Sequence, residues 1–268
     1  MTDIHQTSLP VALITGASSG IGLELGRLLA ADGYDLVLVA RDAKKLQSIG
    51  DELATQYSVL THIFPADLAD PNACAKIMEF LENRKITVDT LINNAGFGTH
   101  GEFATLDLQQ ELNLLQVNIT SLVHLTRLLL PAMLTKKQGQ IMNVASVAAF
   151  QAGPLMACYY ASKAFVLSFT EAVAAETKKT GVKISALCPG PTDTQFHHRA
   201  GIADTPLFRS NTMTSQSVAK IGYLGLKKGK LIVIPGFKNK TLALATRFTP
   251  RKILSAVAKK LNKSRSGK

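Results

Sequence analysis

The sequence predicts a single α/β domain in which a doubly wound parallel sheet is covered by helices on both faces. Short apolar runs alternate with longer segments whose apolar residues recur at helical spacing, which is the order of elements in parallel α/β sheets. The apolar runs are continuous rather than alternating, as expected for strands buried on both faces. With 268 residues, 46% of them hydrophobic, the chain is long enough to bury one sizeable core.

Strands and helices alternate through the first 190 residues. Residues 11–15, VALIT, form a compact run rich in branched side chains, and a glycine-rich turn follows it. The expected strands are 11–15, 35–40, 59–64, 90–94, 141–146 and 182–188. The expected helices are 20–32, 45–57, a segment from about Pro71, two long stretches up to about Lys137, and 157–180.

The alternation stops after Pro189. Residues 191–213 are rich in Thr, Pro, His and Gly, which favours a long loop or a broken helix. A helix from about Ser215 and a strand at 230–235 follow. We place the domain at residues 1–236, and the basic, partly amphipathic C-terminal extension at residues 237–268.

Cysteine usage and the N-terminus predict a cytoplasmic protein. Cys74, Cys158 and Cys188 form no C-x-x-C pair and have no histidines at metal-ligand spacing, so we expect free thiols and no metal site. Residues 1–10 lack a basic segment followed by an apolar one, so no signal peptide is expected. No uncharged apolar run is long enough to predict a membrane span.

The positive charge of the chain is concentrated near its C-terminus. The net charge is +11, yet the last acidic residue is Asp204, and the 64 residues after it carry 15 of the 30 Lys and Arg residues. The preceding part is therefore mildly acidic, with 15 basic and 19 acidic residues. No base-reading module is visible, so nucleic acid is not an expected partner.

Residues 15–22, TGASSGIG, lie between the first strand and the first helix. Glycines at 16, 20 and 22 permit a tight turn and let the backbone approach a pyrophosphate closely. The following helix offers free N–H groups and its positive dipole end to that anion. Because a strand precedes the motif and a helix follows it, the stretch predicts a dinucleotide site rather than an ordinary turn.

Arg41 follows the second strand, where many NAD sites carry a carboxylate for the ribose hydroxyl. Its guanidinium matches a 2′-phosphate, so the residue favours NADP(H) over NAD(H). An exposed arginine without a ligand is the alternative. Asp42 is expected to cap the helix that begins near Ala43.

Several further motifs occur in a fixed order along the chain. They are Asp67 after the third strand, NNAG at 93–96, Asn118 in QVNIT, Ser146 in NVAS, Tyr159 and Lys163 in YYASK, and Pro189–Gly190. With TGASSGIG, they make the chain resemble the classical short-chain dehydrogenase/reductase family over roughly residues 8 to 235. The resemblance implies a Rossmann-type fold and a homo-oligomer, a dimer or tetramer, with its contacts on the long helices around 105–137 and 157–180.

Motifs and resemblance together predict the residues that bind the cofactor. Asp67 would meet the adenine edge, Asn93 and the residues after it would hold the fourth strand against the cofactor, and Thr194 would reach the carboxamide. The predicted cofactor residues are Gly16, Ser18, Ser19, Gly20, Ile21, Gly22, Arg41, Asp67, Leu68, Asn94, Ala95, Gly96, Tyr159, Lys163, Pro189, Gly190, Thr192 and Thr194.

Tyr159 and Lys163 are four residues apart and therefore lie on one face of the predicted helix. A free phenol, with a pKa of about 10, exchanges protons poorly at neutral pH, and a nearby ammonium lowers that pKa. The resemblance assigns Ser146 a hydrogen bond to the substrate oxygen and Asn118 a water that relays protons to Lys163. In place of the family's usual serine pair the chain has a single serine in ASVAAF, which keeps the catalytic position.

The substrate side is expected to be apolar. Residues 195–213 would form a flap whose apolar members are Phe196, Ile202, Leu207 and Phe208. His197 and His198 are either polar contacts in this flap or exposed loop residues. Tyr160 is expected near the pocket, and Phe97 and Phe150 are expected as walls close to the nicotinamide.

The C-terminal extension has two possible apolar faces. The first comprises Leu242, Leu244, Ala245 and Phe248, and the second comprises Ile253, Leu254, Val257, Ala258 and Leu261. Three interpretations stay open: it packs on its own domain or on a neighbouring subunit, it is solvated and partly ordered, or it lies on an anionic membrane surface.

The sequence therefore predicts an NADPH-dependent carbonyl reductase acting on an apolar or lipid-like ketone or aldehyde, such as a 3-oxoacyl thioester. The alternative is a non-catalytic NADP(H)-binding sensor or a membrane-surface scaffold. The presence of Ser146, Tyr159 and Lys163 together favours the enzyme, because a sensor needs no acid–base group.

Overall fold

A seven-stranded parallel sheet forms the centre of the molecule in a computed structural model that describes residues 9–202, 205–206 and 212–263. The strand order is β3-β2-β1-β4-β5-β6-β9, and every neighbouring pair is parallel. The strands are β1 (Val11–Thr15), β2 (Asp35–Ala40), β3 (Thr61–Pro65), β4 (Thr90–Asn93), β5 (Gly139–Val144), β6 (Val182–Leu187) and β9 (Ile232–Val233). This order confirms the doubly wound fold, which reverses direction between β1 and β4.

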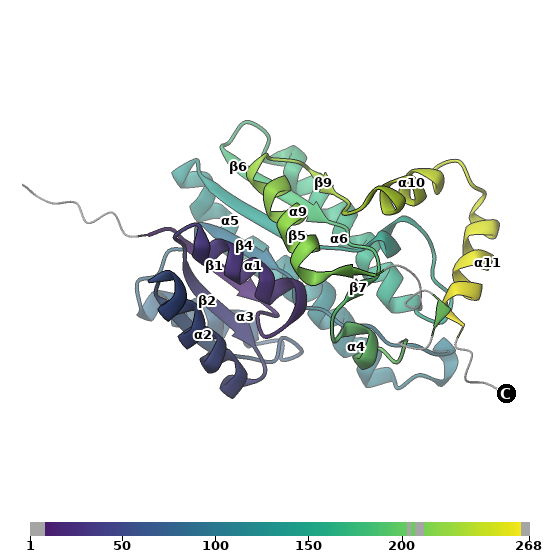
Figure 1. Ribbon diagram of the computed structural model, residues 1–268, viewed down its shortest axis with the longest axis horizontal. Coiled ribbons are helices and arrows are strands. Elements are labelled where there is room, and N and C mark those ends of the chain that lie inside the picture. The colour runs from purple at the N-terminus through teal and green to yellow at the C-terminus, as the bar shows by residue number, and fades with distance from the viewer. Residues whose placement is uncertain (1–8, 203–204, 207–211, 264–268) are drawn as a thin grey trace, which may run out of the picture.

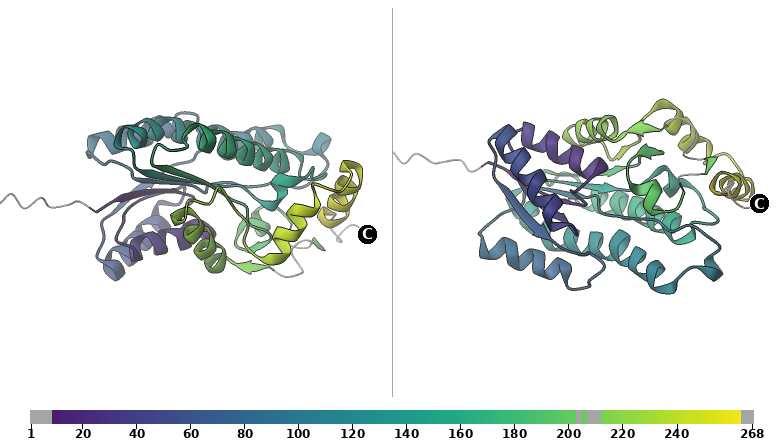
Figure 2. Two further views of the ribbon diagram at one scale, coloured as in Figure 1. Left: turned by 90° about the horizontal axis from the view of Figure 1, so that it is seen from above. Right: turned by 60° about the horizontal axis from the view of Figure 1, so that its bottom comes forward.

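Helices cover both faces of this sheet, as the left view of Figure 2 shows. One face carries α1 (Gly20–Ala31), α2 (Ala43–Tyr57) and α9 (Ser215–Lys227), and the other carries α3 (Ala73–Asn83), α5 (Ser121–Lys136) and α6 (Ala157–Glu176). The interior strands β1, β2 and β4 are buried almost throughout, which explains their continuous apolar sequences.

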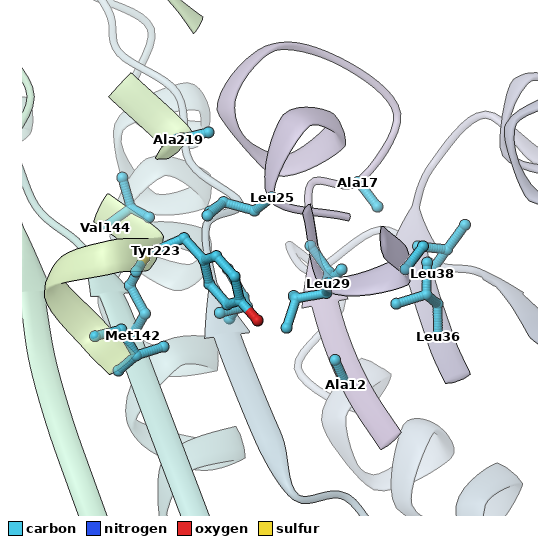
Figure 3. Close-up of a cluster of buried hydrophobic side chains, with 14 of the residues drawn as sticks. Ala12, Ala17, Leu25, Leu29, Leu36, Leu38, Met142, Val144, Ala219 and Tyr223 are labelled. Carbon is cyan, nitrogen blue, oxygen red and sulfur yellow. The ribbon is translucent and has the colours of Figure 1, made fainter. Parts of the chain in front are cut away.

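The core beneath α1 and α9 is shown in Figure 3. Leu25 and Leu29 of α1 are fully buried against strand residues such as Leu36 and Leu38, and Tyr223 of α9 packs beside them. The Tyr223 hydroxyl donates to Asp32 Oδ2 at 2.6 Å, just after the end of α1. This hydrogen bond joins two helices that are almost 200 residues apart in the sequence, and the first of them, α1, begins in the glycine-rich turn.

The opposite face contains the one long apolar helical run among the described residues. Residues Leu108–Lys136 comprise α4 (Leu108–Leu115), a π-helical turn (Gln116–Thr120) and α5. By length and composition this run could cross a membrane, which the sequence interpretation did not expect. Core helices of soluble proteins pass the same test, and Leu125, Leu129 and Met133 of α5 are buried against the sheet.

Up to β6 the element boundaries agree with the sequence to within about four residues, and the larger differences lie after β6. The Asp42 carboxylate accepts a hydrogen bond from the Lys45 N–H at 3.0 Å, which confirms the predicted cap of α2. The strand expected at 230–235 is reduced to β9. The segment expected at 191–213 as a long loop or a broken helix contains β7 (Thr192–Asp193) and the short helix α7 (Phe196–Arg199), and β7 pairs with β8 (Met213–Thr214).

Two helices follow β9 and form a segment that we call the arm, residues 237–263. They are α10 (Phe237–Ala245) and α11 (Arg251–Asn262). Figure 1 shows the arm, in yellow-green and yellow, at the end of the molecule away from β1 and β2. Ala243, Ala258 and Asn262 are buried, so the arm packs on its own domain, as the first of the three interpretations requires.

Candidate active site

A cavity of about 840 Å3 extends from the carboxyl ends of the strands to the arm. Its cofactor side lies at the point where the strand order reverses, which is where doubly wound sheets bind ligands. Seventeen of the eighteen predicted cofactor residues line it, and so does Ser146. Gly22 and Asn118 are the two predicted site residues that do not.

The glycine-rich turn fits a pyrophosphate. Gly16 has a φ of +67°, which an L side chain rarely adopts, and a Cβ on Gly22 would lie 2.4 Å from both Gly16 O and Asn94 Nδ2. Gly22 therefore serves close packing, although it does not line the cavity. Ser19 precedes α1 without forming a side-chain cap, so the first N–H groups of α1 remain available to an anion.

Thr15 and Asn94 tie the end of β4 to this turn. The Thr15 hydroxyl oxygen accepts hydrogen bonds from the N–H groups of Asn94 and Ala95, each at 3.0 Å. The Asn94 amide donates to the carbonyl oxygens of Thr15 and Gly16 at 3.0 and 3.2 Å. Sequence analysis missed Thr15, the final residue of its strand, because a threonine within an apolar strand gives no signal of its own.

Asn93 has a structural role and does not face the cavity. Its amide is buried and donates to Thr126 Oγ1 at 3.1 Å and to Asn143 Oδ1 at 2.9 Å. Asn93 does not line the cavity, although Ala95 and Gly96 do. It connects β4 to α5 and β5, and so holds the fourth strand in place beneath the site.

Arg41 and Asp67 lie exposed on the cavity wall at the ends of β2 and β3. No ion pair of Arg41 occurs among the described residues, which leaves its guanidinium available to an anionic ligand. Asp67 is oriented by its own loop, since its Oδ1 accepts from the Ala69 N–H at 3.0 Å. A cation and an oriented carboxylate on the same part of the cavity wall suit the adenosine end of a dinucleotide.

Tyr159 lies on α6 opposite Ser146, which follows β5. The Ser146 hydroxyl accepts from the Ala148 N–H at 3.1 Å and donates to the Pro189 carbonyl at 3.4 Å, so its position is fixed. Burial raises the pKa of Tyr159 above its ordinary value, and a hydrogen bond with Ser146 opposes that rise. A phenol with a raised pKa keeps its proton at neutral pH, as a proton donor must.

Lys163 lies one helical turn after Tyr159, with Nζ 5.8 Å from the centre of the Tyr159 ring. The ammonium is buried and donates to the Val144 carbonyl at 2.8 Å. Burial lowers the pKa of Lys163 to about 8. The effect of Lys163 on the pKa of Tyr159 stays a prediction, because burial and Ser146 are the leading influences on the phenol.

Asn118 lies in the π-helical turn between α4 and α5. Its Nδ2 donates to Phe97 O and to Ser162 Oγ, both at 3.0 Å, and its Oδ1 accepts from the Phe97 N–H at 3.1 Å. Single π turns inside helices often occur at functional sites. The side chain joins the loop after β4 to α6, and its proposed proton relay to Lys163 stays a prediction.

The residues after β6 close the nicotinamide end. Pro189, Gly190, Thr192 and Thr194 all line the cavity. A Cβ on Gly20 would lie 2.9 Å from Thr194 Cγ2, so Thr194 covers the start of α1. Gly190 contacts the side chain of Asn239 in the arm, which brings the arm directly against this loop.

The substrate end is apolar, as expected, but its walls differ in part from the prediction. Tyr160, Phe97, Phe196 and Ile202 line the cavity. Phe150 does not, because it is half-buried and packs against the core cluster that contains Leu122, Val166 and Leu167. Leu207, Phe208 and the side chain of His198 lie outside the described residues, whereas His197 is half-buried.

The arm supplies most of the remaining substrate wall, which sequence analysis did not predict. Its apolar members in the cavity are Leu242, Ala243, Ala245, Ile253, Leu254, Val257 and Leu261. Asn262, only 1% exposed, fixes α11: it accepts from the Tyr160 hydroxyl at 3.3 Å and donates to the Pro154 carbonyl at 3.0 Å. The Asn262 carbonyl is 2.7 Å from His100 Nε2.

Comparison with protein families decides the identity. The family model for short chain dehydrogenases matches residues 10–203. The chain belongs to the short-chain dehydrogenase family. This confirms the resemblance inferred from the motifs, and the family supports an oxidoreductase that binds NAD(P)(H) and acts on small molecules.

Relatives of this short-chain dehydrogenase include reductases of lipid-like carbonyls. A very-long-chain 3-oxoacyl-CoA reductase of Anas platyrhynchos is 33% identical over 221 residues, covering 81% of this chain and 69% of the relative. A solved short-chain dehydrogenase of Sphingobium yanoikuyae in complex with NADPH has a TM-score of 0.80 at 31% identity, covering 90% of this chain and 94% of that one. A bulky-bulky ketone specific alcohol dehydrogenase of Comamonas testosteroni has a TM-score of 0.76 at 29% identity, with the same coverage.

Proposed function

We propose that this short-chain dehydrogenase reduces an apolar, lipid-like ketone or aldehyde to an alcohol with NADPH. The observation that carries the proposal is the arrangement of Ser146, Tyr159 and Lys163 between a dinucleotide-shaped cavity end and an apolar cavity end. The same groups serve the reverse oxidation, so the cofactor ratio sets the direction of the reaction.

The chain supplies the proton and the orientation. NADPH, when bound, supplies a hydride to the carbonyl carbon. Ser146 holds the carbonyl oxygen by a hydrogen bond, and Tyr159 transfers its phenolic proton to that oxygen as the carbon–oxygen π bond opens. The Lys163 ammonium, charged below about pH 8, stabilises the negative charge left on the phenol oxygen.

Arg41 supports NADPH over NADH. It is exposed on the wall where the adenosine ribose would lie, and its guanidinium can bind a 2′-phosphate through two hydrogen bonds. The neighbouring Asp42 carboxylate is engaged in capping α2, so it does not replace the guanidinium as the ribose ligand. The NADPH-bound structure from Sphingobium yanoikuyae is consistent with this preference.

The apolar arm supports a long-chain substrate such as a 3-oxoacyl thioester. Leu242, Leu254, Val257 and Leu261 form a continuous wall beyond Tyr159 and Tyr160. Each methylene buried against such a wall contributes about 0.8 kcal/mol. We therefore expect kcat/KM to rise with acyl length until the wall is filled.

The test is NADPH oxidation by the purified chain over 3-oxoacyl thioesters of increasing length, steroids, quinones and aldehydes, with NADH measured in parallel. Arg41→Glu should reduce kcat/KM for NADPH at least tenfold and leave NADH little changed. Lys44→Glu, the same charge change on an exposed lysine outside the cavity, is the matched control. A preference of the unaltered chain for NADH contradicts the role of Arg41.

The sensor or scaffold interpretation makes a different prediction. A sensor would bind NADPH tightly and turn over no carbonyl in the series. Turnover of one substrate class that Tyr159→Phe abolishes excludes this interpretation. For oligomeric state we propose a homo-oligomer, to be measured by light scattering, because short-chain dehydrogenases often assemble in this way.

A further inference from the structure

The outer face of α10 exposes large apolar side chains. Phe237 is 83% exposed, Leu244 is 56% exposed and Phe248, three residues after the end of α10, is 81% exposed. Phe237 and Leu244 are seven residues apart and therefore lie on one side of α10, and Phe248 is in the turn that follows this helix. Exposed aromatic side chains on one face of a helix need a partner, because water solvates them poorly.

This outer face is separate from the substrate wall. Phe237, Leu244 and Phe248 do not line the cavity. Asn239, Ala243 and Thr246 do, and they lie on the opposite side of the same helical segment. The arm therefore has an inner face for the substrate and an outer face with no partner among the described residues.

Basic side chains lie beside the outer face. Lys240 and Arg247 are exposed, and their helical spacing places both on the same flank of Phe237 and Leu244. The arm carries no acidic residue and eight basic ones: Lys238, Lys240, Arg247, Arg251, Lys252, Lys259, Lys260 and Lys263. None of the eight forms an ion pair with any residue that the structure describes.

Helix stability explains only some of these charges. Arg251 and Lys252 occupy the first turn of α11, where the helix dipole disfavours cations, and that turn has no acidic residue. Lys259 and Lys260 are near the C-terminal end of α11, where cations are favourable. A sequence that places basic residues at both ends, and acids at neither, indicates an anionic partner outside the chain.

We propose that the outer face of the arm binds an anionic lipid surface. Exposed apolar side chains beside unpaired cations supply the two signals that peripheral membrane binding requires. The face is a convex helix side and not a groove that would receive a peptide. A second copy of the same face would bring like charges together, so self-association through it is disfavoured.

Membrane binding would also place the substrate cavity at the lipid surface. Leu242, which is 57% exposed, and Val257, which is 50% exposed, line the cavity from the arm, so the cavity is open to the surroundings along the arm. A lipid-like carbonyl could then enter from the bilayer without crossing water. This last step rests on the proposed function, whereas binding to the surface does not.

The experiment is sedimentation of the full chain with two kinds of vesicle, phosphatidylcholine alone and phosphatidylcholine enriched in phosphatidylglycerol, at low and high salt. We expect binding to the anionic vesicles only, weakened by salt. Lys240→Glu/Arg247→Glu should weaken it at least tenfold, since each cation near such a surface contributes about fivefold. Phe237→Ser/Phe248→Ser should also weaken it, and should do so at both salt concentrations.

Lys44→Glu/Lys178→Glu is the matched control, because it makes the same change in charge at exposed sites away from the arm. The control should sediment like the unaltered chain, and all variants should keep the turnover of a short water-soluble ketone. The proposal is overturned if anionic vesicles leave the unaltered chain in solution, or if the arm variants bind as tightly as the control. It is also overturned if the Phe237 and Phe248 changes abolish self-association or binding to an acidic carrier protein while vesicle binding persists.

Discussion

The two ends of the cavity are built in different ways. The cofactor end consists of backbone turns at strand ends, held by contacts such as Thr15 with Asn94, and Gly16 and Gly20 allow the chain to come close to a ligand. The apolar end, which we propose binds the substrate, consists of side chains, many of them from the arm, and Asn262 holds the arm to α6 across 102 residues of sequence. The cofactor end is thus built into the sheet, whereas much of the apolar end belongs to a segment that can vary without disturbing the sheet.

Tyr159 stands between the two ends, and its loss should have the largest effect. Tyr159→Phe removes the proton donor but keeps the ring, so we expect a fall in kcat of about 10²–10⁴-fold. NADPH affinity, measured by titration calorimetry, should stay within a few-fold. Tyr160→Phe is the control, since it loses only the hydrogen bond to Asn262. Equal losses in both variants would show that the neighbouring tyrosine, and not Tyr159 alone, carries the proton.

Lys163 should give the cofactor end a pH dependence. Its folded pKa of about 8 lies below its ordinary 10.5, so the ammonium is present below pH 8 and is lost as the pH rises through that value. We expect kcat/KM for reduction to fall about tenfold per pH unit above it, since kcat/KM reports ionisations of the free enzyme. Lys163→Arg keeps the charge and should move this fall to higher pH. An unchanged profile in the arginine variant would assign the fall to another group.

Asn262 tests the substrate end alone. Asn262→Ala leaves the Tyr160 hydroxyl and the Pro154 carbonyl without partners, which costs about 1–3 kcal/mol of arm docking. We expect KM for a long acyl substrate to rise by about tenfold, with short substrates and NADPH affinity little affected. Asn262→Asp keeps the acceptor for Tyr160 but loses the donor to Pro154, so it should also raise KM for the long acyl substrate.

The exposed neighbour Lys263→Ala serves as the matched control for Asn262. If NADPH affinity fell together with long-chain activity in Asn262→Ala, the two ends of the cavity would not be independent.

Replacement of Asp32 should have the smallest effect of these changes, because Asp32 lies at the end of α1 that is remote from the cavity. Hydrogen bonds from Lys227 and Tyr223 lower the pKa of Asp32 below its ordinary 3.8, so its contribution to stability is present above that value and is lost as the pH falls through the lowered pKa. The carboxylate is partly exposed, so Asp32→Asn should cost less than about 1 kcal/mol at neutral pH and nothing in strong acid. Urea unfolding at neutral pH and in strong acid measures this change in the free energy of unfolding, with Glu176→Gln as the control.

The difference between the two ends of the cavity also explains which site residues the sequence could predict. The glycines, Arg41 and the Tyr159–Lys163 pair are recognisable because their geometry follows from spacing within one turn or one helix. The position of the arm depends on the contacts of the buried Asn262 with Tyr160 on α6 and with Pro154 in the loop before it. No local period in the sequence encodes contacts between residues more than 100 positions apart.

Phe150 shows the reverse case. It was expected as a wall close to the nicotinamide, but it ends the short helix Val147–Phe150 and packs against a core cluster instead. Proximity along the chain is a weak guide wherever the backbone changes direction within a few residues.

The tie between Asn262 and Tyr160 also orders events during synthesis. Chains are made from the N-terminus at about 5–20 residues per second, and segments fold as they become available. The glycine-rich turn and all seven strands of the central sheet are translated before the arm. A newly made chain can therefore hold its dinucleotide while its substrate pocket is still open to water, and selectivity is the last property that the growing protein acquires.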